Sequence, residues 1–138
     1  MIKVQTQNFS IENEINLLLQ RNNNVGAISS FVGVVRNKFR DKDLISMTLE
    51  HYPGMTEKSI ASIIDEAQQR WPVPWVNVVH RVGELQPSEQ IVLGMVGSAH
   101  RDAAVAAAEF IVAYEYTNQT LNLKFASSIN SLSIGSVI

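Results

Sequence analysis

The sequence contains no cysteine among its 138 residues. This absence excludes a disulfide-stabilised scaffold, a thiolate nucleophile, and zinc or iron–sulfur sites held by cysteine. Cations are scarce in the last quarter of the chain, where Lys124 is the one lysine or arginine after Arg101. The net charge of −2 also excludes a strong overall positive field of the kind that attracts nucleic acid or anionic membranes.

Long apolar runs are absent as well. No stretch approaches the roughly 18 apolar residues of a membrane span, and the opening "MIKVQTQNF" lacks the apolar core of a signal peptide. We therefore expect a cytoplasmic protein. A hydrophobic content of 46% with 17% charged residues is typical of a globular chain, and the length favours a single domain over residues 1–138.

Periodicity predicts an α+β fold in which helices pack on a largely antiparallel sheet. Ser10 and Thr56 are expected to cap the first two helices. The second helix is expected to bury one apolar stripe, made of Ile60, Ile63, Ile64, Ala67 and Trp71. Beyond Tyr116 the chain has little periodicity, which favours a loop or edge strand followed by a loose terminus. The expected β-α-β-β-α-β-β-α order is strand 2–7, helix 10–20, strand 25–36, strand 44–52, helix 56–71, strands 75–83 and 90–100, and helix 101–114.

The stretch "VGAISSFVGVVR", residues 25–36, is apolar on both alternating sets of positions. This pattern predicts a central strand that is covered on both faces, within which Gly33 marks a bulge or a close approach. Charged residues alternate after it, which favours an exposed charged hairpin that opposes aggregation at an edge. These are Arg36, Lys38, Arg40 and Lys42.

Three cationic or titratable side chains are candidates for an anion pocket. His100 and Arg101 lie where a strand becomes a helix, and the unpaired N–H groups of a helix start attract anions. Arg36 ends an apolar strand, and its guanidinium can grip a phosphate or carboxylate with two hydrogen bonds. The alternatives are that Asp102 caps the helix beside a solvated Arg101, and that Arg36 pairs with Asp41 or Asp43 at the rim.

The remaining polar residues give weaker indications. His51, His80 and His100 are the only histidines, and no two have the spacing of a helical metal site, so we expect no metal and no cofactor. Glu50 and Glu57 could act as acid and base, but strand-end and helix-cap roles are the simpler interpretation.

Five segments together give the chain a specific resemblance. They are "FVGVVRN", "LEHYPGMTEKSI", "DEAQQRWPV", "VVHRVGEL" and "GSAHRDAA". Their order and spacing resemble the large, catalytic subunit of molybdopterin synthase, across about residues 1–112. The resemblance implies a hammerhead-type α/β fold, with residues 113–138 as a divergent tail.

The resemblance also implies an activity. Members of that family transfer sulfur from the thiocarboxylated C-terminus of a small ubiquitin-like subunit to cyclic pyranopterin monophosphate, which makes molybdopterin. Two large subunits form a central homodimer within a heterotetramer. By similarity, the substrate-contacting segments are Val34, Val35 and Arg36, together with His100 and Arg101, and the His-Arg pair reaches a pocket shared with the neighbouring subunit.

The chain departs from the family after about Ile111. The family carries two active-site lysines there, the second of them in an Ala-Pro-aromatic-Trp-Lys type sequence. An ungapped alignment puts Tyr116 and Leu123 at those positions, and Lys124 is one residue off. In an extended strand, such a slip points the side chain to the opposite face.

Three explanations are open for this departure: an artefact such as a frameshift, a natural variant without activity, or a local bulge that brings Lys124 into place. The abrupt change in composition favours the first two. The corresponding functional alternatives are a synthase subunit, with full activity or with activity impaired by the altered tail, and a catalytically inactive subunit that binds the ubiquitin-like partner. A third is an unrelated module that uses the Arg36, His100 and Arg101 cluster for another phosphorylated ligand.

Overall fold

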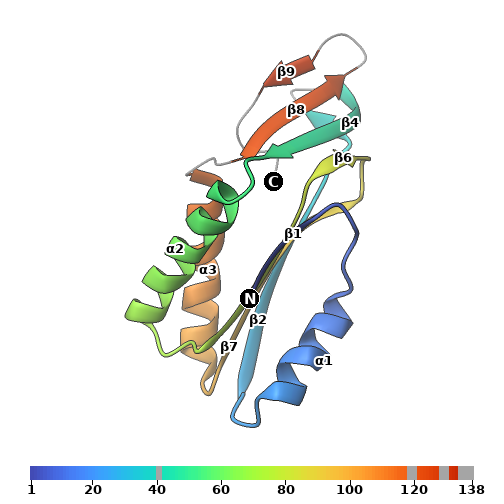
Figure 1. Cartoon of the computed structure of the whole chain (residues 1–138). Coiled ribbons are helices and arrows are strands. Elements are labelled where there is room, and N and C mark those ends of the chain that lie inside the picture. The colour runs from blue at the N-terminus through green and yellow to red at the C-terminus, as the bar shows by residue number, and fades with distance from the viewer. Residues whose placement is uncertain (40–41, 118–120, 128–130, 134–138) are drawn as a thin grey trace.

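The computed structural model describes residues 1–39, 42–117, 121–127 and 131–133. Helices and strands follow one another along the chain as shown in Figure 1. The elements are β1 (Ile2–Gln5), α1 (Ile11–Arg21), β2 (Ala27–Val34), β3 (Lys38–Phe39), β4 (Lys42–His51), α2 (Met55–Arg70), β5 (Trp75–Arg81), β6 (Gly83–Leu85), β7 (Gln90–Ser98), α3 (Arg101–Thr117), β8 (Leu121–Ser127) and β9 (Ser131–Ser133).

The strands form two sheets. The larger core sheet has the order β1-β5-β7-β2, in which β1 runs parallel to β5 and the other neighbours are antiparallel. The smaller sheet has the order β3-β4-β8-β9, with β6 also paired to β4, and all its pairs are antiparallel. The α+β class and the largely antiparallel pairing are therefore confirmed.

Helices cover both faces of the core sheet (Figure 1). Strand β7 is buried on both faces, because its side chains are divided between two hydrophobic clusters. Leu93 and Met95 join the cluster on the α1 side, where Leu18 and Phe9 pack. Val92 and Val96 join the larger cluster on the side of α2 and α3.

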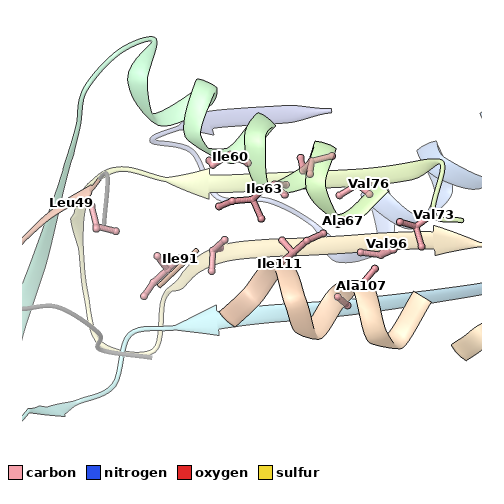
Figure 2. Close-up of a cluster of buried hydrophobic side chains, with 14 of the residues drawn as sticks. Leu49, Ile60, Ile63, Ala67, Val73, Val76, Ile91, Val96, Ala107 and Ile111 are labelled. Atoms are coloured by element: carbon pink, nitrogen blue, oxygen red, sulfur yellow. The ribbon is translucent and has the colours of Figure 1, made fainter. Parts of the chain in front are cut away.

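Figure 2 shows the larger cluster, in which aliphatic side chains of α2 and α3 meet those of the sheet. Helix α2 contributes the predicted stripe of Ile60, Ile63, Ile64 and Ala67. Helix α3 contributes small residues, Ala107 among them with 0% of its surface exposed. Small side chains allow α3 to lie close to the sheet.

The first helix begins as predicted, because the Ser10 hydroxyl accepts a hydrogen bond from the backbone N–H of Asn13. The second does not. Helix α2 begins at Met55 after Gly54, whose φ of 84° suits glycine, and the Glu57 carboxylate accepts the Gly54 N–H at 2.8 Å. The expected cap role of Glu57 is confirmed. Thr56 is fully buried instead of capping, and its hydroxyl has no hydrogen-bond partner within the part of the chain that the structure describes.

The expected central strand at 25–36 is wrong in one respect. Among the described residues, strand β2 is an edge strand of the core sheet and pairs only with β7. Its faces are covered, because Ile28 and Val32 pack on the α1 side and Phe31 on the other. The predicted bulge is present, as a register shift between Gly33 and Val34.

The charged stretch after β2 forms the predicted hairpin, with Lys38 opposite Asp43 in β3 and β4. Arg40 and Asp41 lie outside the described residues. The segment after Tyr116 was expected to be a loop or edge strand. It contains β8, which pairs with β4 on one side and β9 on the other and is therefore an interior strand. Within the described part of the chain, no helix has the length and apolar character to span a membrane.

Replacing Leu93 by alanine should lower the free energy of unfolding by about 2–5 kcal/mol, because a fully buried leucine leaves a cavity when truncated. The matched control is Leu19→Ala, which removes the same atoms from a side chain that is 47% exposed and should cost less than about 1 kcal/mol. Urea unfolding of the two variants checks this. Equal losses would contradict the placement of the α1-side core.

Candidate functional site

The Arg36 segment leaves the core sheet at the end of β2. Val34 is 39% exposed, Val35 is 2% exposed and Arg36 is exposed. The backbone of Val35 is held on both sides, because its N–H donates to Glu89 O at 2.9 Å and its carbonyl accepts the Ser88 N–H at 2.8 Å. A buried anchor therefore immediately precedes the exposed guanidinium.

The His100–Arg101 segment begins α3. The Ser98 hydroxyl accepts the His100 N–H at 3.3 Å and donates to Pro72 O at 2.9 Å, which orders the turn into the helix. Gly26 lies so close to this turn that a Cβ there would stand 2.1 Å from Ala99 O. His100 is exposed, and Arg101 lies beside Asp102 with Nε and Oδ1 3.7 Å apart.

The Arg101–Asp102 pair is open to water, with both side chains at least 90% exposed. An exposed pair of this kind contributes little to stability. Within a single chain, Arg101 thus matches the simpler interpretation of a solvated surface charge.

The two segments lie at opposite ends of β2. Ala27 pairs with Ser98, whereas Val34 pairs with Gln90. Seven residues of strand separate these positions by about 23 Å. The structure therefore does not bring Arg36 together with His100 and Arg101 in one chain, and a pocket that contains all three requires a second chain.

The divergent tail is placed by its backbone pairing. Tyr116 lies in the last turn of α3, while Leu123 pairs with Leu49 and Lys124 with Thr48 in the β4–β8 ladder. The stretch is extended, as the register argument required. The register shift of this ladder lies between Leu44 and Ser46, so a bulge at Lys124 does not account for the departure from the family.

An open groove of about 410 Å³ runs between β2 and α3. Sequence reasoning missed it, because it depends on how the helix lies over the end of the sheet. Its composition is mainly small and aliphatic. The lining residues are Ser29, Ser30, Phe31, Val105, Ala108, Glu109, Val112 and Ala113.

The histidines have different environments. Among the described residues, no group of three or more His, Asp or Glu side chains could hold a metal ion. His80 is 2% exposed, and its Nδ1 lies 2.9 Å from Arg81 O, so the ring is hydrogen-bonded within the chain. Burial lowers the pKa of His80 from 6.5 to about 4, against the raising effect of that hydrogen bond and with a lowering contribution from His51.

This burial makes stability depend on pH. Below pH 6.5 the unfolded chain protonates His80, whereas the folded chain keeps it neutral until about pH 4, so the free energy of unfolding falls as pH is lowered through this range. The loss should approach about 3 kcal/mol. A His80→Gln variant should show a shallower decline between pH 7 and 4.5 in urea unfolding, and His100→Gln should not. An unchanged slope in His80→Gln would contradict the assignment.

Comparison with known proteins gives a consistent result. The family model described as MoaE protein matches residues 4–114. The chain is 48% identical over 113 residues to the molybdopterin synthase catalytic subunit of Vibrio cholerae, which covers 82% of this chain and 75% of that protein.

Solved structures agree. The MoaE protein of molybdopterin biosynthesis from Burkholderia ambifaria is 38% identical, with a TM-score of 0.86 over 100% of this chain and 90% of that one. A complex of subunits 1 and 2 of molybdopterin-converting factor from Helicobacter pylori contains a chain with the same fold. The TM-score is 0.78 at 14% identity, over 96% of this chain and 88% of that one.

Proposed function

The chain belongs to the MoaE protein family, and from this membership we propose that it is the large, catalytic subunit of a molybdopterin synthase. Its reaction transfers sulfur from the thiocarboxylated C-terminus of a small ubiquitin-like subunit to cyclic pyranopterin monophosphate. The 48% identity to a catalytic subunit over 82% of this chain is the observation that carries the proposal.

The chemistry of the candidate residues supports this function. The substrate is a phosphate ester, and Arg36, His100 and Arg101 are side chains that bind anions through charge and hydrogen bonds. The same cations would stabilise the negative charge that develops as the thiocarboxylate attacks. The chain lacks cysteine, which fits a reaction whose sulfur is brought by the partner.

We further propose that the active unit is a homodimer formed along β2. The strand ends the core sheet, and its sequence "AISSFVGV" has no charged residue to discourage pairing. The opposite end of the sheet is the shorter β1, which carries Lys3. The groove between β2 and α3 offers Val105, 57% exposed, as apolar surface beside that edge.

Antiparallel pairing of β2 with its copy would complete the site. A two-fold axis near Ser30 would place Val34 of one chain beside the start of β2 in the other. That start pairs with Ser98, two residues before His100. Arg36 of one subunit would then face His100 and Arg101 of the other, and each dimer would contain two such sites.

Subunit complementation tests this arrangement. Arg36→Ala and the double variant His100→Ala, Arg101→Ala should each reduce turnover by at least about a hundredfold, because each removes cations from both sites. Mixed dimers contain one intact site, so coexpression of the two chains should restore about a quarter of wild-type turnover. Coexpressing two differently tagged copies of Arg36→Ala is the control. Failure to recover activity in purified mixed dimers would contradict a shared site.

The tail favours a second candidate function, a subunit that binds the small partner without turnover. Tyr116 and Leu123 stand where the family resemblance implies active-site lysines, and Lys124 pairs with Thr48, one position away from Leu123. This observation concerns catalysis alone. It leaves the fold unchanged.

Turnover with purified components separates the two functions. The wild-type chain, mixed with thiocarboxylated small subunit and precursor, should give molybdopterin detectable by mass spectrometry. If Lys124 serves the reaction, Lys124→Ala should lower kcat by about tenfold or more, whereas Lys58→Ala on helix α2 should not. Tight binding of the small subunit with no product would instead establish the binding function and overturn the catalytic one.

A further inference from the structure

A short turn is hydrogen-bonded to the backbone of the residue before Arg36. The turn spans residues 86–89 and joins β6 to β7. Ser88 donates its N–H to Val35 O at 2.8 Å, and Glu89 O accepts the Val35 N–H at 2.9 Å. These two bonds fix the peptide groups on both sides of the Val35 Cα, one residue before the proposed active-site guanidinium.

The turn has an unusual backbone conformation. Ser88 has a φ of 74°, in the left-handed region that residues other than glycine adopt rarely. A conformation of this kind persists when its surroundings hold it in place. The Glu89 carboxylate supplies one restraint, since its Oε2 accepts the Gln86 N–H at 2.6 Å, and the Glu89 N–H donates to Gln86 O at 3.1 Å.

Glu89 also connects the turn to a buried cation. Its Oε1 lies 3.6 Å from Nη1 of Arg81, whose side chain is 8% exposed. Nη1 donates to Gln90 O at 2.9 Å, while Nε and Nη2 donate to Thr6 O at 3.2 and 3.1 Å. Arg81 is thus held by the core sheet independently of Glu89, and the carboxylate attaches the turn to it.

We propose that Glu89 is a positioning residue for Arg36, acting by locking the 86–89 turn that holds Val35. Its Oε2 keeps the turn closed and its Oε1 ties it to Arg81, so the carboxylate determines where the two backbone groups that bind Val35 lie. The catalytic part of this proposal rests on the proposed function. Its structural part does not.

The expected effect is local. Without the carboxylate, the turn can relax from the strained Ser88 conformation, and Val35 loses a rigid partner for both of its hydrogen bonds. Displacement of a charged side chain by about 1 Å can lower a rate by up to a hundredfold. Arg81 keeps its three bonds to backbone carbonyls, so the core should be little affected.

The experiment compares Glu89→Ala with Glu84→Ala. Glu84 is exposed on neighbouring β6, and its carboxylate contacts the Gln86 side chain at 3.4 Å but neither Arg81 nor the Gln86 N–H. Amide hydrogen exchange at Val35 should be at least about tenfold faster in Glu89→Ala and unchanged in Glu84→Ala. Exchange at Leu93 should be unchanged in both. Equal Val35 exchange in the two variants, or acceleration at Leu93 as large as at Val35, would overturn the proposal.

A double-variant cycle tests the link to catalysis. Glu89→Ala should lower kcat/KM about tenfold, but it should lower it no further when Arg36 is already alanine. Additive losses would show that Glu89 acts by another route and would overturn the proposal. If the wild-type chain gives no product, the proposed function fails, and the exchange result at Val35 alone decides whether Glu89 positions the Arg36 segment.

Discussion

The antiparallel pairing of β2 with β7 is the constraint on which the proposed site depends. It sets Ala27 opposite Ser98 and Val34 opposite Gln90, so the chain enters α3 at one end of the strand pair and presents Arg36 at the other. A single chain therefore holds the two halves of the proposed anion site apart. In the proposed dimer, antiparallel association of a second copy would bring complementary halves together, so that the chemistry would depend on the oligomeric state.

Local sequence signals predicted most of the helices and the class of the fold. The stripe of α2 and the Ser10 cap involve residues within a few positions of one another, and both are confirmed. Strand β2 shows a limit of such local signals. Apolar residues on both alternating sets indicate that both faces of a strand are covered, and both are. They carry no information about lateral neighbours, and β2 has one where a central strand would have two.

Long-range pairing explains the remaining differences between the sequence predictions and the structure. Strand β8 pairs with β4, some 75 residues earlier in the chain, so no window of local sequence could reveal that it is an interior strand. The grouping of Arg36 with His100 and Arg101 was predicted from their shared chemistry. Chemistry can identify side chains suited to one ligand, but topology decides whether they meet, and here it separates them within the chain.

The same topology restricts what the divergent tail can do. The ladder runs without a register shift from Leu121 to Phe125, and β9 pairs with β8 at Lys124 through Ser133. Moving Lys124 into the place of Leu123 would require β8 to slip against both neighbours and would reverse the face of every residue in it. Such a slip would break the backbone pairing of β8 with β4 and with β9 at the same time. Lys124 must therefore act from its position opposite Thr48 or not at all, so the proposed function depends chiefly on the cations Arg36, His100 and Arg101.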